Sequence, residues 1–192
     1  MNELFEQLPL TNDLQGVNFG PYMWLADARL RIISIFDDLR FDRADLDMMS
    51  PAMCIHVIRR LAPLGFIQTS GNILRNEATG VRCLTPKFIG LEASPFDITR
   101  YHPRSEMDFY ILTPTQTACQ YVDNYPFATA VERVRILISR QPVNLYKISD
   151  YLEYKPSHQR FADAIAHLSL IQSEAVDSEP LKTRHALGSV GV

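Results

Sequence analysis

A run of donors and cations between residues 155 and 160 has the side-chain types that proteins use to contact nucleic acid. Glutamine pairs bidentately with adenine and arginine with guanine, so Gln159 and Arg160 suit base readout. Lysine and the free amide groups at a helix start suit phosphate oxygens. The alternative is a solvated polar face at the start of a helix. The predicted base-contacting set is Lys155, Ser157, His158, Gln159 and Arg160.

Further cations stand in two other parts of the chain, and these suit phosphate contact better than base reading. Two adjacent arginines end an apolar helical pattern, and three cations lie in or near the hairpin pattern that follows it. Two more stand beyond a turn near the end of the sequence. These predicted phosphate-contacting residues are Arg59, Arg60, Arg75, Arg82, Lys87, Lys182 and Arg184.

The charge of the 192-residue chain is unevenly distributed, although its net charge of −3 does not by itself indicate a polyanion partner. Residues 50–104 carry seven basic and three acidic side chains, and residues 133–160 carry six basic and two acidic ones. Residues 1–49 carry four basic and nine acidic side chains. Because the local field matters most at close range, the two basic zones suit DNA and the acidic zone suits a basic partner.

No pattern in the sequence indicates an enzyme, a metal site or a cofactor. The chain has no glycine-rich phosphate loop, no nucleophile elbow and no His-Glu-x-x-His motif. Cys54 and His56 are two apart on an expected helix, so they point in different directions. Cys83 adds no zinc-type spacing. The aspartates between residues 37 and 47 are expected to form a solvated face or a dock for a basic partner.

The elements expected to carry these residues follow the order of three helices and a β-hairpin. Apolar residues at three- and four-residue spacing, among them Trp24 and Ile32, predict the first helix. Ser50-Pro51 has the residue types of a helix start, and Pro63 and Gly65 end that helix. The expected elements are helices at 21–39, 43–49 and 51–62, and strands at 66–69, 73–75 and 81–84.

The same order repeats after a boundary at Asn124-Tyr125-Pro126, which indicates an internal structural repeat. Residues 86–112 read as an insertion or an enlarged wing, with a strand at 109–112 and a helix at 113–121. The repeat is expected to hold helices at 130–141, 146–152 and 156–168, a short strand at 143–145, strands at 170–173 and 182–187, and a turn at 177–180.

The run from Ser50 to Pro86 resembles the DNA-binding core of MarR-type winged-helix regulators. The resemblance rests on an apolar helix exit, a charged wing and a strand that ends in Leu-Thr, although the wing lacks the family's Asp ahead of its Arg. The tandem arrangement also resembles the accessory subunits of bacterial chromosome-condensing complexes. The matching residues are Leu61, Gly65-Phe66-Ile67, Arg75, Arg82 and Leu84-Thr85.

The sequence therefore predicts an α+β, mainly α protein with tandem winged helix-turn-helix domains. The expected division is an N-terminal arm at 1–20, a first unit at 21–124 and a second unit at 125–192. The resemblance implies a transcriptional regulator that binds double-stranded DNA as a homodimer. The alternative is a protein-interaction module that uses its winged helices to hold a partner protein.

The sequence predicts a cytoplasmic location for either function. Three widely spaced cysteines are an odd number and favour a reducing compartment. No apolar run reaches the length of about 20 residues that a membrane helix needs, and the first residues lack the pattern of a signal peptide.

Overall fold

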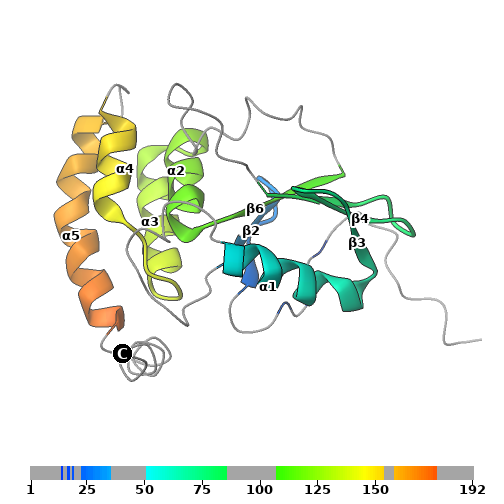
Figure 1. Cartoon of the computed structure of the whole chain (residues 1–192). Coiled ribbons are helices and arrows are strands. Elements are labelled where there is room, and N and C mark those ends of the chain that lie inside the picture. The colour runs from blue at the N-terminus through cyan, green and yellow to red at the C-terminus, as the bar shows by residue number, and fades with distance from the viewer. Residues whose placement is uncertain are drawn as a thin grey trace, which may run out of the picture.

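A six-stranded mixed β-sheet is the framework of the molecule (Figure 1). The computed structural model describes residues 14, 17, 19, 23–35, 51–85, 107–153 and 158–176. Its strands are β1 (Met23–Asp27), β2 (Ile32–Ile35), β3 (Phe66–Ser70), β4 (Ile73–Asn76), β5 (Arg82–Leu84) and β6 (Asp108–Leu112). Its helices are α1 (Pro51–Leu61), the 3-10 turn η2 (Ala62–Leu64), α2 (Pro114–Asn124), α3 (Phe127–Ile138), α4 (Leu145–Leu152) and α5 (His158–Val176).

The strand order is β1-β2-β6-β5-β4-β3, with parallel pairing at its centre. β6 lies between β2 and β5 and runs parallel to both. The outer pairs β1–β2, β4–β5 and β3–β4 are antiparallel. The two central parallel pairs bring the start of β6 beside the starts of β2 and β5, so residues far apart in the sequence meet at one end of the sheet.

One face of the sheet is covered by α1. Side chains alternate between the two faces of a strand, and the buried apolar residues of β3 to β6 on this side are Phe66, Leu74, Cys83, Phe109 and Ile111. Met53, Val57 and Leu61 of α1 pack there against buried side chains that include Phe66 and Phe109. Burial of each such side chain contributes about 1.5 to 3 kcal/mol, so this layer fixes α1 on the sheet.

The opposite face is covered unevenly. Figure 1 shows α2 to α5 side by side at the end of the molecule away from the β3–β4 hairpin. Their core cluster includes Ile32, Tyr110 and Leu112 from β2 and β6, and Leu137 and Phe161 from the helices. α2 packs on β2 and β6, so the helices cover the middle of the sheet and leave the outer part of β4 and β3 open.

The prediction of an α+β, mainly α protein with tandem winged helices is wrong, because the strands form one continuous six-stranded mixed sheet of an α/β fold. The expected hairpin at 66–84 is present as β3, β4 and β5, and α1 ends at η2 and Gly65 as expected, with Gly65 at a φ of 83°. In a winged helix this hairpin would be an edge of a small unit. Here β5 pairs with β6, which joins it to β2 and β1. The boundary between residues 124 and 125 remains a prediction.

Three predicted elements are corrected by the structure. The helix expected at 21–39 is the β1–β2 hairpin over residues 23–35. The strand expected at 143–145 is irregular chain that enters α4, and the strand expected at 170–173 is part of the long helix α5. The helix expected at 43–49, the turn expected at 177–180 and the strand expected at 182–187 lie outside the described residues. Most of the expected insertion at 86–112 also lies outside them, and its last part is β6.

None of the helices in the described ranges is both long enough and apolar enough to span a membrane.

Candidate anion-binding site at the arginine end of the sheet

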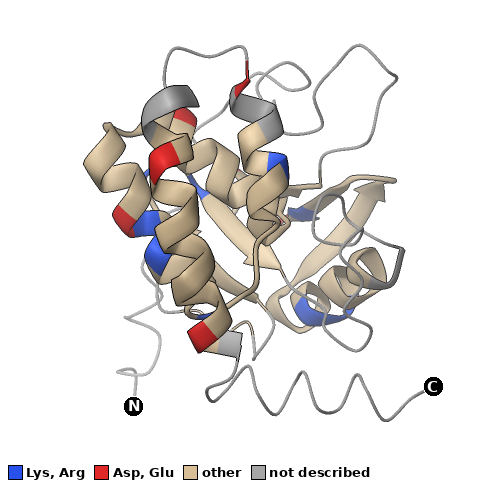
Figure 2. Ribbon diagram, turned by 90° about the vertical axis from the view of Figure 1, so that its left-hand side faces the viewer, with Lys and Arg blue, Asp and Glu red and all other residues tan. Residues whose placement is uncertain are grey.

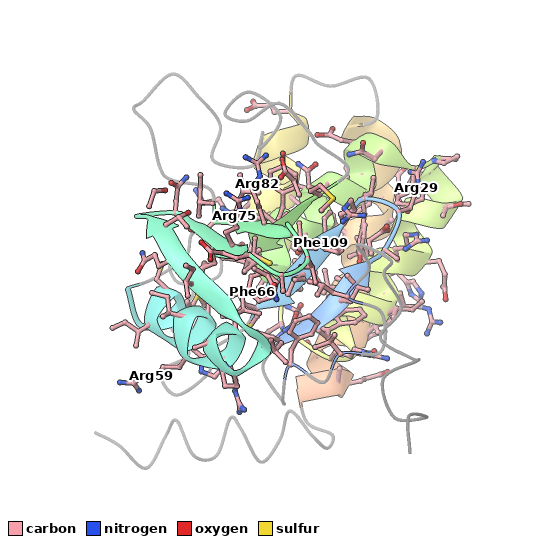
Figure 3. All side chains as sticks on the ribbon, turned by 90° about the vertical axis from the view of Figure 1, so that its right-hand side faces the viewer. Arg29, Arg59, Phe66, Arg75, Arg82 and Phe109 are labelled. Atoms are coloured by element: carbon pink, nitrogen blue, oxygen red, sulfur yellow. The ribbon has the colours of Figure 1, made fainter. Side chains whose placement is uncertain are left out.

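Five arginines gather around the end of the sheet where the parallel strands begin. We call this surface the arginine end. Figure 3 shows Arg29, Arg82 and Arg75 across it, with Arg59 on the other side of the edge strand β3, beside α1. The sheet brings these residues together from the β1–β2 turn, β4, β5 and α3. The arginine end consists of Arg29, Arg31, Arg75, Arg82 and Arg133.

Arg82 is held rigidly by a buried carboxylate. Its Nε and Nη2 atoms donate to the two carboxylate oxygens of Asp108 at 2.7 and 2.8 Å. The Asp108 side chain is fully buried, whereas that of Arg82 is 39% exposed. The hydrogen bond to Asp108 raises the pKa of Arg82. The pairing therefore fixes one edge of the guanidinium and leaves its remaining surface for solvent or a ligand.

Arg75 is the neighbour of Arg82 on β4, and the two residues are directly paired in the antiparallel register. Leu74 and Cys83, the adjacent paired residues, belong to the cluster with α1. Arg75 and Arg82 therefore share the opposite face, which the helices leave open here. Arg75 is exposed and has no hydrogen bond or ion pair within the described part of the chain.

Arg31 lies at the start of β2 in a strained conformation. Its φ is 56°, in the left-handed region that favours glycine. Its Nε donates to the backbone carbonyl of Asp108 at 2.9 Å, and its guanidinium lies 4.0 Å from the ring centroid of Phe109. These contacts offset the cost of a residue other than glycine at this position. Asp108 therefore bonds to Arg31 through its backbone carbonyl and to Arg82 through its carboxylate.

Arg29 and Arg133 lie on either side of one tyrosine. Each guanidinium is 4.2 Å from the ring centroid of Tyr125. The buried Asp27 carboxylate accepts from the Tyr125 hydroxyl at 2.6 Å and from Arg133 at 2.7 Å. Burial and the hydrogen bond to Asp27 raise the pKa of Tyr125. Arg29 also donates to the Asn124 carbonyl, so this cluster fastens the β1–β2 turn to the junction of α2 and α3.

The arginine end has a positive charge that its own carboxylates only partly neutralise. Five arginines face two bonded aspartates, Asp27 and Asp108, which leaves three positive charges among these described residues. The helical side differs, because Figure 2 shows Lys and Arg interspersed there with Asp and Glu. On that side Arg135, for example, is paired with Glu132 on the same helix. Guanidiniums bind carboxylates or phosphates, and Arg75 and the N–H groups of Arg82 that do not bond to Asp108 are placed to do so, so the arrangement suits an anion.

The structure brings only part of the predicted residue set to this site. Arg75 and Arg82 lie in it, and Arg59 and Arg60 are exposed at the end of α1. His158, Gln159 and Arg160 lie in the first turn of α5, where only their backbone is described, and their DNA contact stays a prediction. The structure therefore describes the side chains of four predicted residues, which are Arg59, Arg60, Arg75 and Arg82. The predicted residues outside the described ranges are Lys87, Lys155, Ser157, Lys182 and Arg184.

Sequence reasoning missed Arg29, Arg31 and Arg133. The first two lie within the helix that the sequence predicts at 21–39, whereas the structure places them in the turn between β1 and β2. The available signal was Asp27 four residues before Arg31, because an Asp that begins a turn can bond to the backbone within it. Asp27 does so here, accepting from the Leu30 amide at 2.7 Å.

The residues that the structure describes contain no group of three or more His, Cys, Asp or Glu placed to hold a metal ion. All three cysteines are free, and burial raises the pKa of Cys54 and Cys83. Comparisons with protein-family models, curated proteins and solved structures gave no match for this chain.

Proposed function

We propose that this protein binds duplex DNA without catalysing a reaction, through phosphate contacts made by the arginine end. The observation that carries the proposal is the direct pairing of the exposed Arg75 with Arg82, on the face of the sheet that the described helices leave uncovered at this point. Like charges in register across two strands destabilise a sheet. An anion that binds both side chains would offset this cost.

The width of the arginine end suits several phosphates. Arg31 precedes β2 at the end of the sheet and stacks on Phe109 of the α1 face, whereas Arg75 lies on β4 on the opposite face, three strand positions away. At about 4.8 Å per strand, this separation is roughly 14 Å. Duplex DNA carries one charge per about 1.7 Å of its axis, so a surface of this width would face several phosphates at once. Such contacts position a protein on DNA without reading its sequence.

A role in transcription and a dimeric state belong to the same proposal. Phosphate contacts alone give modest affinity, and two copies of one site on a duplex would strengthen binding through effective concentration. The free thiols are consistent with a reducing compartment. In this proposal the predicted base-contacting set, Lys155, Ser157, His158, Gln159 and Arg160, supplies base contacts to the same duplex.

A second candidate is the binding of a protein partner at the β3 edge. Ile55 of α1 and Ile67 of β3 are 50% and 51% exposed, and Leu64 between these elements is also exposed. Exposed apolar side chains on an edge strand and on the helix beside it suit a protein better than a nucleic acid. The two functions differ in their response to salt, because only the phosphate contacts depend steeply on it.

The test is fluorescence anisotropy of a labelled random-sequence duplex, titrated with the full chain at low and moderate salt. We expect binding that weakens steeply with salt, and we expect Arg75→Gln to lower the affinity by about fivefold or more. Arg135→Gln is the matched control, because it removes an equal charge from a residue paired on α3. No binding by the wild-type chain at low salt would refute the proposal and favour the protein partner.

A further inference from the structure

The pairing of Arg75 with Arg82 differs from the other arginine contacts at this end of the sheet. Arg29, Arg31 and Arg133 each lie against an aromatic ring and a hydrogen-bond acceptor. Arg75 is registered with the apolar Ile67 on β3 and with Arg82 on β5, so the charged cross-strand neighbour that it meets there is another cation. Directly opposed residues in an antiparallel pair have Cβ atoms about 4.5 to 5.5 Å apart. Two guanidiniums that start so close together can both reach one small anion.

Asp108 determines how Arg82 can take part in this contact. The row of registered residues runs from Ile67 through Arg75 and Arg82 to Asp108, one residue on each of four neighbouring strands. The carboxylate holds Arg82 from the β6 side, opposite Arg75. The Arg82 atoms that do not bond to Asp108 are its Nη1 and the remaining N–H of Nη2. Fixing these groups in advance lowers the entropy cost of binding an anion.

We propose that Arg75 and Arg82 hold one phosphate group between them, and that Asp108 is the residue that positions Arg82 for it. The ligand class is a phosphodiester of a nucleic-acid backbone, so this inference rests on the proposed function. A bidentate guanidinium matches the oxygens of a phosphate, and a second guanidinium supplies the charge that the buried Asp108 has neutralised. The clamp contacts the phosphate alone and is therefore indifferent to base sequence.

A double-variant cycle with Arg75→Gln and Arg82→Lys tests the shared phosphate. Arg82→Lys keeps the charge beside Asp108 but removes the fork of donors. If both residues hold one phosphate, each variant weakens binding to the duplex, and the double variant loses clearly less than the product of the two losses. Independent effects that multiply would overturn the clamp. Arg135→Lys, at an equally bidentate pair on α3, should leave the affinity unchanged.

Asp108→Asn tests the positioning role by the sign of its effect. The substitution makes the chain more positive, so simple electrostatics predicts tighter binding to DNA. We expect weaker binding, by about threefold or more, and a salt dependence reduced by close to one phosphate contact. Glu132→Gln is the control, because it removes the bidentate partner of Arg135 and raises the charge equally. Binding by Asp108→Asn that is as tight as that of Glu132→Gln would overturn the role of Asp108.

The outcomes separate the clamp from the proposed function. Circular dichroism identifies whether Asp108→Asn folds, and Arg82→Lys tests the same positioning if it does not. Salt-dependent DNA binding without coupling between Arg75 and Arg82 overturns the clamp and leaves the proposed function intact. Absence of DNA binding by the wild-type chain at low salt overturns both.

Discussion

At the scale of single residues, the buried charges of this protein act mainly as anchors for arginines. Asp27 and Asp108 lie almost wholly out of solvent, and each accepts from a guanidinium that is partly exposed. A carboxylate is costly to bury unless it is bonded on several sides. Asp27 meets this requirement through Leu30, Tyr125 and Arg133. The two aspartates thus tie surface arginines to the sheet.

Asp27→Asn should destabilise the fold by about 2 kcal/mol, because Arg133 loses its charged acceptor and the Tyr125 hydroxyl loses a strong one. The figure lies below that for a fully buried pair, since Arg133 is 35% exposed. Urea unfolding followed by tryptophan fluorescence measures the change. Glu132→Gln, which breaks a solvent-exposed pair beside Arg133, should leave the midpoint almost unchanged. An equal loss in both variants would contradict the anchoring role of Asp27.

At the scale of elements, α2 is the helix most deeply enclosed. Its residues from Pro114 to Val122 are buried, so its first turn cannot rely on water for its free amide groups. Thr113 and Gln116 form a capping box that supplies acceptors for two of these amide groups. The Thr113 hydroxyl accepts from the Gln116 amide at 3.2 Å, and the Gln116 side chain accepts from the Thr113 amide at 3.0 Å.

Thr113→Ala should therefore cost about 1 to 2 kcal/mol of stability, because it leaves a buried amide without an acceptor. Thr113→Ser keeps the oxygen and should recover most of this loss. Thermal or urea unfolding of both variants gives the comparison. Thr69→Ala on the exposed strand β3 is the surface control, for which we expect a change within about 0.5 kcal/mol. Equal losses for Thr113→Ala and Thr113→Ser would show that packing, and not the cap, is responsible.

The elements that sequence reasoning predicted correctly are those with local signals. The turn at Gly71-Asn72 and the polar tip before Gly80 marked the strands from 66 to 84, and Thr113-Pro114 marked the start of α2. The β1–β2 hairpin was missed because Ile32, Ile33, Ser34 and Ile35 are all buried. A strand buried on both faces loses its alternation, and its apolar run then fits a helical spacing as well.

The course of α5 shows a different limit. A strand was expected at 170–173 by analogy with the first unit, where Pro63 and Gly65 end the helix and a strand follows. The corresponding region of the expected second unit has no glycine or proline to end the helix. The helix instead continues to Val176, and Gln172 bonds to both backbone groups of Val143. Site prediction had the same limit, because Arg31 and Arg82 meet only through β6, a pairing that no local pattern encodes.

At the scale of the whole molecule, the buried Cys83 thiol and Tyr121 hydroxyl should make the fold less stable at alkaline pH. Loss of solvent around Cys83 raises its pKa from 9.0 to about 12, and burial likewise raises the pKa of Tyr121. Between these pH values the folded state keeps the Cys83 proton and the unfolded state loses it. The unfolded state then binds fewer protons, so the free energy of unfolding falls as pH rises.

The contribution of Cys83 is fully present below about pH 9 and should decrease by about 1.4 kcal/mol per pH unit above it. Urea unfolding between about pH 8 and about pH 10.5 measures this slope. Cys83→Ala removes the titrating group, so it should be less stable at neutral pH but lose stability more slowly as pH rises. Leu74→Ala is the matched control, because it opens a cavity at the paired position on β4 without removing a proton. Its slope should equal that of the wild type. An equal slope in Cys83→Ala would place the alkaline sensitivity elsewhere, with the Tyr121 hydroxyl, which donates to the Ala26 carbonyl, as the next group to replace.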